Sequence, residues 1–200
     1  MRIRDKMKGM VDDLVVDIVG FSGGIWLLWN SSCNTVEEKD RSFQHLHVSV
    51  EQGTTKWMST AVYGNPALIQ RRGLWNSLRD IAEDISDPWL VAGDFNSILY
   101  ASEKSGGAPF DASRVRDFQD CVLDAGLIDL GFSGPPFTWF HAGKKERIDQ
   151  GMVNAAWHSA FPESLVQHLP KIKPDHRPLL VHMNSSYQPA GPKPFCFLAA

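Results

Sequence analysis

The 200-residue sequence has few cysteines, no long hydrophobic run and no strong net charge. Its three cysteines, Cys33, Cys121 and Cys196, are too widely spaced for a zinc motif or a disulfide framework, which indicates a reducing compartment. No apolar stretch reaches membrane-spanning length, and no hydrophobic segment follows the charged start Met1–Lys6. We therefore expect an intracellular protein, nuclear or cytoplasmic, without a signal peptide and without membrane contact.

The formal net charge of −3 argues against a protein that binds nucleic acid by bulk electrostatic attraction. An enzyme with this composition that acts on nucleic acid needs a local basic patch or bound metal ions to offset the phosphate charge. Hydrophobic residues make up 43% of the chain and charged residues 22%, which is typical of one globular domain with a sizeable core.

Strand and helix patterns occur together along the chain. Apolar or alternating runs predict strands at Val15–Val19, Ile25–Trp29 (buried), Leu46–Val50 (half-buried), Lys56–Tyr63, Trp89–Gly93, Phe137–Phe140, Leu165–His168 and Leu179–Val181 (buried). Helical spacing predicts helices over Ile3–Leu14, from Pro66 to Ile85 with Asn65 as N-cap, and from Asp111 to a C-terminal cap at Gly126.

The order of these elements favours one fold class over another. Strands and helices alternate only partly and hairpins are mixed in, so we expect an α/β fold of the α+β type, a sandwich with mixed sheets, rather than a doubly wound parallel sheet. The domain covers residues 1–183. From Asn184 the composition shifts to Ser, Gln, Pro and Gly, which predicts that residues 184–200 form a linker or disordered tail.

The apolar run that begins at Trp89 ends in Gly93-Asp94-Phe95-Asn96. Residues two apart on a strand point to the same side, so Asp94 and Asn96 face one place at the end of the strand. A carboxylate and an amide there fit a phosphate or metal site. The same residues also fit a simple turn, and their spacing alone leaves both interpretations open.

Further polar residues follow other predicted strands: Tyr63, Asp149, and Asp175 with His176. Taken singly, Tyr63 fits a half-buried strand tyrosine, and Asp149 fits an ion pair on a hairpin surface, with Arg147 or Lys145. The pair Asp175-His176 fits an ordinary loop.

Taken together, these side chains have complementary chemistry. A histidine held by a carboxylate such as Asp149 acts as a general base or stabilises a phosphoryl oxygen. Asp175 is a suitable ligand for a hard cation such as Mg²⁺ or Mn²⁺. Asp94 and Asn96 would orient a water molecule, and Tyr63 would contact a developing phosphate charge.

Seven short motifs stand in a fixed order between Gly20 and Met183. They are Gly23–Trp26, Tyr63–Pro66, Gly93–Asn96, Glu103–Gly107, Gly134–Trp139, Arg147–Asp149 and Asp175–Leu179. With them the chain resembles the endonuclease/exonuclease/phosphatase superfamily, in particular the apurinic-type endonuclease domain of plant LINE-type non-LTR retrotransposons. The resemblance implies a four-layered α/β sandwich that hydrolyses phosphate esters with Mg²⁺ or Mn²⁺, and DNA as the ancestral substrate.

The resemblance also implies a role for each matching residue. Asp94 would orient or activate the attacking water, and Asn96 would help to hold the phosphate. His176 and Tyr63 would contact the phosphate. Asp149 would orient His176. In addition, Asp175 would be an acid of the metal site.

The start of the chain departs from the family pattern. The family begins with a strand that ends in Asn and continues to a strand that ends in a metal-binding Glu, but Met1–Gly24 contains neither residue. Glu37 and Glu38 come after the Ile25–Trp29 strand and are out of register for that role. We therefore expect a domain that lacks its first strands and binds its metal weakly or not at all.

Two further positions differ from the family: Pro174 stands where Ser is usual, and Gln150 where plant members often carry a basic residue.

Three functions are compatible with the sequence. The first is a divalent-metal-dependent endonuclease, the second an inactive retroelement-derived remnant, and the third a phosphatase of small phosphoesters. The sequence does not decide the oligomeric state.

Overall fold

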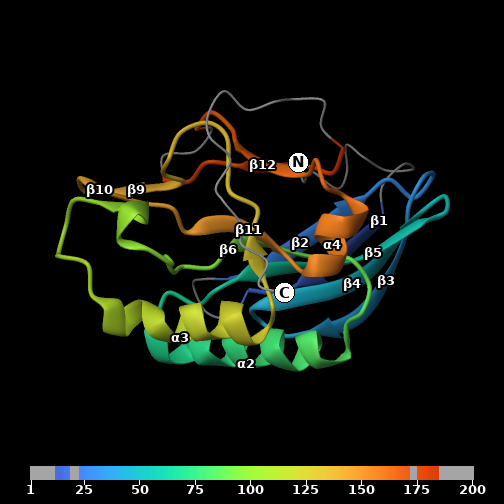
Figure 1. The fold of residues 1–200 in the computed structure, drawn as a ribbon, viewed down its shortest axis with the longest axis horizontal. Helices are drawn as coiled ribbons and strands as arrows, with labels where there is room; N and C mark the ends of the chain where they lie inside the picture. The colour runs from blue at the N-terminus through green and yellow to red at the C-terminus, as the bar shows by residue number, and fades with distance from the viewer. Residues whose placement is uncertain (1–11, 19–22, 172–174, 185–200) are drawn as a thin grey trace.

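A computed structural model describes residues 12–18, 23–171 and 175–184, and its centre is a six-stranded mixed sheet (Figure 1). The strand order is β3-β4-β5-β6-β11-β8. The strands are β3 (Thr35–Arg41), β4 (His45–Gln52), β5 (Thr55–Tyr63), β6 (Trp89–Asp94), β8 (Ile128–Asp129) and β11 (Asp149–Val153). Within this sheet β5 and β6 are parallel, because a helix crosses over between them, and the other pairs are antiparallel.

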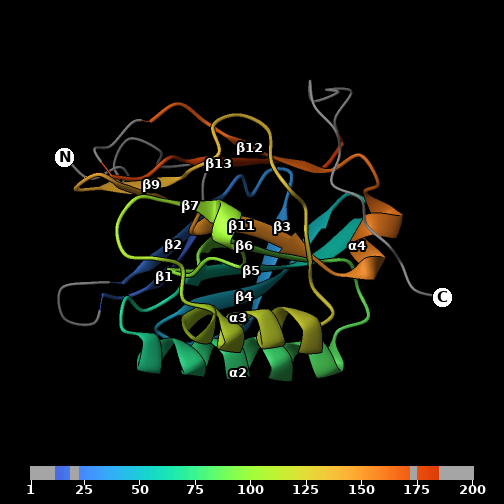
Figure 2. The same cartoon turned by 60° about the vertical axis from the view of Figure 1, so that its left-hand side comes forward.

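Two helices, α2 (Leu68–Asp84) and α3 (Ala112–Asp124), lie side by side on one face of this sheet (Figure 2). The apolar side chains of α2 recur every three or four residues, so one stripe faces the sheet. That stripe belongs to the main core. There it packs with Trp89 and Val91 of β6, with Phe95 directly after β6, and with Phe118 of α3. Ion pairs join the helices on their outer side, between Arg72 and Asp117 and between Arg79 and Asp124.

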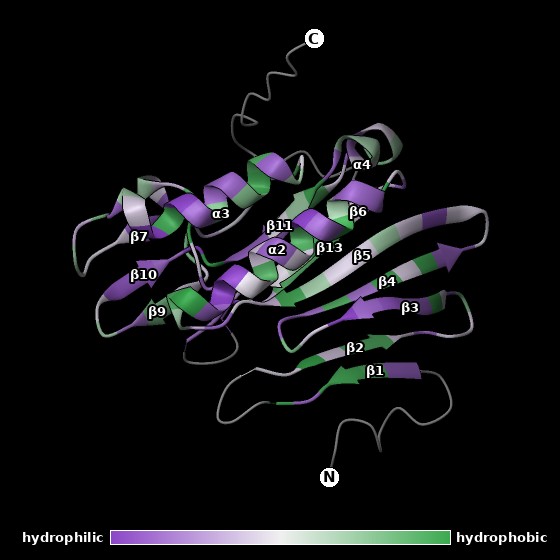
Figure 3. Cartoon of the chain, turned by 90° about the horizontal axis from the view of Figure 1, so that it is seen from below, coloured by the Kyte–Doolittle hydropathy of each residue, from purple (hydrophilic) through white to green (hydrophobic). Residues whose placement is uncertain are grey.

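The opposite face of the sheet carries two strand pairs and a short helix. They are β1 (Asp12–Val16) with β2 (Ile25–Trp29), β12 (Leu165–His168) with β13 (Leu179–His182), and α4 (Ala155–Ala160). Figure 3 shows that β1 and β2 are mostly hydrophobic apart from the start of β1. Their inner side chains pack on Leu46 and Val48 of β4. The predicted α/β sandwich with mixed sheets is confirmed.

A third small sheet lies at one end of the molecule. It contains β7 (Lys104–Ser105), β10 (Lys144–Glu146) and β9 (Trp139–His141) in that order, and the short 3₁₀ helix η1 (Ala101–Glu103) leads into it. Among the described residues no helix is both long and apolar enough to cross a membrane.

Several sequence predictions were wrong in detail. Leu14, expected in a helix, lies in β1, while the rest of that predicted segment before Asp12 is outside the described residues. The strand β2 is half-buried rather than buried, since Trp26 and Leu28 are exposed, and β13 likewise exposes Leu180. The strand β4 is buried on both faces from His45 to Ser49, because α2 covers one face and β1–β2 the other.

Two errors concern element boundaries. The strand β3 was not predicted, because Val36 is its only apolar residue and the charged residues Glu37–Arg41 follow it. The helix α2 has Ala67 as its N-cap, since Asn65 instead accepts a hydrogen bond from the Ala67 amide and forms a turn before the helix. By contrast, Asp111 caps α3 as predicted, and Gly126 follows its C-terminus with a positive φ. Pro174 and residues 185–200 lie outside the described residues.

Candidate functional site

Three polar residues form a row across neighbouring strands. Tyr63 at the end of β5 pairs with Asp94 at the end of β6, and Asp94 pairs with Asp149 at the start of β11. Paired residues of neighbouring strands project to the same face of a sheet. The apolar residues that alternate with them, Val91 and Met152, face the helices. The row therefore lies on the face opposite α2 and α3, at the end of the sheet.

Two glycines allow the backbone to come close behind this row. Gly93 has a φ of 144°, and a Cβ atom there would lie 2.2 Å from the Val62 carbonyl oxygen. A Cβ atom on Gly64 would lie 2.3 Å from the Phe95 oxygen. The Gly64 amide donates to the Asp94 carbonyl at 2.6 Å. Side chains at these two positions would push the ends of β5 and β6 apart, so the glycines set the spacing of the row.

Asn96 turns the chain at the end of β6 and also orients Asp94. It has a φ of 47°, a conformation that asparagine tolerates better than most residues. Its backbone amide donates to Asp94 Oδ1 at 2.8 Å, and its side-chain amide donates to Asp94 Oδ2 at 3.1 Å and to the Gly64 oxygen at 2.8 Å. The turn and site interpretations of these residues are thus compatible, because the turn fixes the carboxylate.

His176 reaches the row from a distant part of the chain. Its Nδ1 atom lies 3.0 and 3.2 Å from the two carboxylate oxygens of Asp149, and because a carboxylate only accepts, Nδ1 is the donor. His176 also forms a bridge with Trp139 of β9, and the next amide, that of Arg177, donates to the Thr138 oxygen. The hydrogen bond to Asp149 raises the pKa of His176 above its ordinary value, against the opposing effect of burial.

The ligand atoms of Asp94, Asp149 and His176 all lie within 4.8 Å of one another. Burial and the neighbouring Asp149 charge raise the pKa of Asp94 to about 7, although the backbone hydrogen bond from Asn96 opposes the shift. Two adjacent carboxylates at a partly buried strand end are a costly arrangement without a counter-charge. The cluster can therefore bind a cation or exchange a proton near neutral pH.

The other predicted site residues stand around this cluster. Tyr63 is half-buried in the same row, and its ring is 3.8 Å from the position of a Cβ atom on Gly23. Asp175 is exposed, and its carbonyl oxygen accepts a hydrogen bond from the Phe140 amide. Its carboxylate is not one of the three groups that converge among the described residues.

Asp149 does not pair with Arg147, although the sequence allowed that interpretation. Arg147 is buried and bonds to Glu103 at 2.6 Å and to Asp129. Asp149 is instead held by Thr138, whose hydroxyl oxygen accepts from the amides of Ile148 and Asp149 at 3.1 Å each. Thr138 and Glu103 stand within two of the sequence motifs, but no role for either could be predicted, because their partners are distant in the chain.

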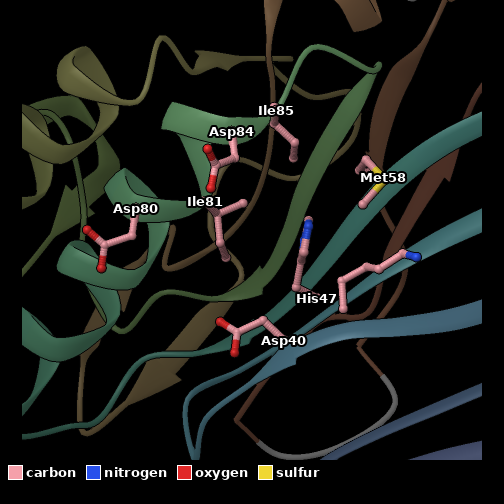
Figure 4. Close-up of a pocket in the computed structure, with 8 residues that line it drawn as sticks. Asp40, His47, Met58, Asp80, Ile81, Asp84 and Ile85 are labelled. Carbon is pink, nitrogen blue, oxygen red and sulfur yellow. The ribbon is translucent and has the colours of Figure 1, made fainter.

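A separate hollow of about 390 Å³ lies between α2 and the sheet, on the face opposite the cluster (Figure 4). Asp80 and Asp84 of α2 line one side, and Asp40 and His47 line the other. Burial lowers the pKa of His47 to about 4, so the ring is neutral at physiological pH. This hollow contains none of the residues in the row.

Comparison with known proteins places the fold. The family model described as "Endonuclease/Exonuclease/phosphatase family" matches residues 5–170. The endonuclease domain of TRAS1, a telomere-specific non-LTR retrotransposon, has a similar structure with a TM-score of 0.66 and 11% identity, over 92% of this chain and 90% of that chain. A comparison with curated proteins finds no match.

Two further solved structures are similar. An endonuclease/exonuclease/phosphatase family protein from Leptotrichia buccalis gives a TM-score of 0.56 at 13% identity, over 89% of this chain and 74% of that chain. TDP2 from D. rerio, complexed with a single-strand DNA product, gives 0.55 at 15% identity, over 87% and 75%. At such low sequence identity, the similarity to these structures shows the fold alone. Because the family model matches most of its length, the chain belongs to the endonuclease/exonuclease/phosphatase family.

Proposed function

We propose that this protein is a divalent-metal-dependent phosphodiester hydrolase, an endonuclease that acts on DNA. The observation that carries the proposal is the convergence of Asp94, Asp149 and His176 at one strand end. Family membership supports hydrolysis of a phosphate ester. The resemblance to plant LINE-type endonuclease domains supports DNA as the substrate, as does the similar structure of the endonuclease domain of TRAS1.

The donor set fits Mg²⁺ or Mn²⁺. Carboxylate oxygens are the ligands that these cations prefer, and Asp94 and Asp149 supply them side by side. The raised pKa of Asp94 indicates negative charge that a cation would relieve. Asp175 is proposed as a further acid of this site, on the resemblance. When bound, the cation would stabilise negative charge on the phosphate oxygens.

Residues of the chain would transfer the proton and hold the phosphate. Asp94 would accept a proton from the attacking water as its oxygen bonds to phosphorus and the ester oxygen leaves. Asp149 favours the cationic form of His176, which would donate a hydrogen bond to a phosphate oxygen. Asn96 and Tyr63 would help to hold the phosphate beside Asp94, within the same row.

Two alternatives differ from this proposal in testable ways. An inactive remnant is favoured by the absence of Asn and Glu from Met1–Gly24, since the resemblance implies a metal-binding Glu at the end of an early strand. Such a protein would keep the fold without binding metal. A phosphatase of small phosphoesters would release inorganic phosphate and leave DNA intact.

Nicking of supercoiled plasmid tests all three. We expect the purified protein to nick plasmid with Mg²⁺ or Mn²⁺ and not in EDTA. His176→Ala should slow nicking by about 10²- to 10⁴-fold, because it removes the group that offsets phosphate charge. Asp120→Asn, on the exposed side of α3, is the matched control and should nick at the wild-type rate.

The outcomes separate the hypotheses. Wild-type protein that is folded but inactive on plasmid, and that releases phosphate from small esters, would indicate the phosphatase. Protein that does neither would indicate the remnant. Equal nicking by wild type and His176→Ala would show that the Asp94 cluster is not the active site.

A further inference from the structure

Arg71, in the first turn of α2, is a buried cation with an unmet hydrogen-bonding need. Its side chain is only 6% exposed, and in the part of the chain that the structure describes its Nε atom is buried without a hydrogen-bond partner. The other arginines of α2 differ: Arg72 and Arg79 each donate through Nε to an aspartate of α3 at 2.8 Å. A buried guanidinium nitrogen without an acceptor destabilises a protein, so its presence calls for an explanation.

The position of Arg71 is fixed relative to the candidate site by Gln44. This buried glutamine accepts the Tyr63 amide at its carbonyl oxygen at 2.8 Å and the Asn65 amide at Oε1 at 2.7 Å. Its Nε2 donates to the Gln70 oxygen at 3.0 Å. Gln44 thus ties the residue before Arg71 to the strand end that carries Tyr63.

The surrounding charges place the Arg71 guanidinium near the site. Burial lowers its pKa, as does the nearby Arg114, while Asp94 and Glu146 oppose that shift. The Arg71 charge in turn opposes the rise in the pKa of Asp94 that burial and Asp149 cause. Glu146 already pairs with Lys104 at 2.9 Å, and Asp94 is engaged by Asn96. Both carboxylates near Arg71 therefore have closer partners, and among the described residues the Nε atom of Arg71 keeps no acceptor of its own.

We propose that Arg71 binds a phosphate of the nucleic-acid strand, next to the phosphate held between Asp94 and His176. The two positions differ because the Asp94 row projects to the face of the sheet away from α2, whereas Arg71 belongs to α2. A site that holds two phosphates selects a polymer over a small phosphomonoester. This inference rests on the proposed function for the identity of its ligand.

The test is binding of a short oligothymidylate in EDTA, measured by fluorescence anisotropy at several salt concentrations. Each phosphate contact on a single strand contributes about 0.7 to the slope of log K against log salt. Arg71→Met should weaken binding several-fold and lower that slope by about 0.7. Arg71→Lys should keep most of the slope. Arg79→Met, which removes a paired arginine two turns along the same helix, should leave it unchanged.

Thermal unfolding separates a binding role from a structural one. Since Met replaces a buried, unpartnered guanidinium with an apolar chain of similar length, Arg71→Met should unfold at the wild-type temperature or above it. A lower melting temperature, failure to fold, or an unchanged salt slope would each overturn the proposal. So would a wild-type protein that does not bind the oligonucleotide.

A mononucleotide control keeps this inference distinct from the proposed function. Binding of thymidine monophosphate, which has one phosphate, should be the same in wild type and Arg71→Met. Nicking is measured separately with metal. An intact Arg71 effect without nicking would reject the endonuclease and retain the second phosphate position, whereas nicking without an Arg71 effect would do the reverse.

Discussion

Two clusters of charged side chains lie close together in this protein and differ in how their charges are balanced. Arg147 is surrounded by Glu103 and Asp129 and also stacks on Phe132 at 5.0 Å. Glu103 in turn accepts the Leu99 amide at 2.6 Å. The second cluster places Asp94 beside Asp149, two like charges, with His176 as counter-charge.

This contrast in charge balance indicates which cluster stabilises the fold and which is available to a ligand. In the Arg147 cluster each charge meets an opposite one. Burial lowers the pKa of Arg147, but Asp129 and Glu103 together outweigh it and raise that pKa above its ordinary value. In the Asp94 cluster a carboxyl pKa of about 7 shows that ionisation is opposed. We therefore expect the protein to be destabilised when Arg147 loses its charge and stabilised when Asp94 loses its charge.

The largest effect should come from Arg147→Met. It would leave Glu103 and Asp129 without their counter-charge at a site where the Arg147 side chain is 4% exposed. Removing one partner of a buried ion pair costs about 3–5 kcal/mol, and we expect a loss of that size in urea unfolding. Arg79→Met breaks an ion pair with a partly exposed aspartate and should cost less than about 1 kcal/mol. Equal losses in the two variants would remove the distinction between the clusters.

A smaller effect of opposite sign should follow Asp94→Asn. The folded state prefers protonated Asp94, so its contribution to stability is present below pH 4 and is lost as the pH rises toward about 7. The full shift corresponds to about 4 kcal/mol, and because solvent reaches Asp94 we expect about 1–2 kcal/mol at pH 8.

The measurement is thermal unfolding in EDTA at two pH values. Asp94→Asn should melt about 3–6 °C above wild type at pH 8 and match it at pH 4. Because the Asn side chain retains an oxygen that can accept the Asn96 amide, the turn should persist. A variant less stable than wild type at pH 8 would mean that the Asp94 charge is well compensated. The Asp94 cluster would then not differ from the Arg147 cluster in its charge balance.

The sequence predicted the elements of the second cluster better than those of the first. Local patterns were sufficient for β6, for the β4–β5 hairpin and for the Asp111 cap, since each depends on neighbouring residues. The order of motifs then predicted that Asp94, Asp149 and His176 serve one site, and the structure brings these three together.

Contacts between residues that are distant in the chain could not be predicted from the sequence. Arginine and acidic residues can form surface ion pairs, buried ion pairs or ligand contacts, and the sequence does not distinguish these. Arg147 has an aspartate two residues away in the sequence, yet its partners, Glu103 and Asp129, are 44 and 18 residues away. Arg71 stands beside Arg72 in an ordinary helix pattern, and only burial distinguishes the two. Glu37 and Glu38 lie in β3, a strand of the central sheet whose only apolar residue is Val36.

A third effect, similar in size to that of Asp94→Asn, distinguishes an enzyme from a remnant. Because Mg²⁺ and Mn²⁺ bind ionised carboxylates, either ion should raise the melting temperature at pH 8 and have little effect at pH 5, where Asp94 is protonated. At ten times the dissociation constant the gain is about 1.4 kcal/mol, which corresponds to about 3–6 °C for a chain of this length. Asp94→Asn should abolish the gain, and Asp120→Asn should keep it. If wild type shows no gain at pH 8 in saturating Mn²⁺, Asp94 and Asp149 hold no cation. The like charges of Asp94 and Asp149 would then be the remnant of an ancestral site that no longer binds metal.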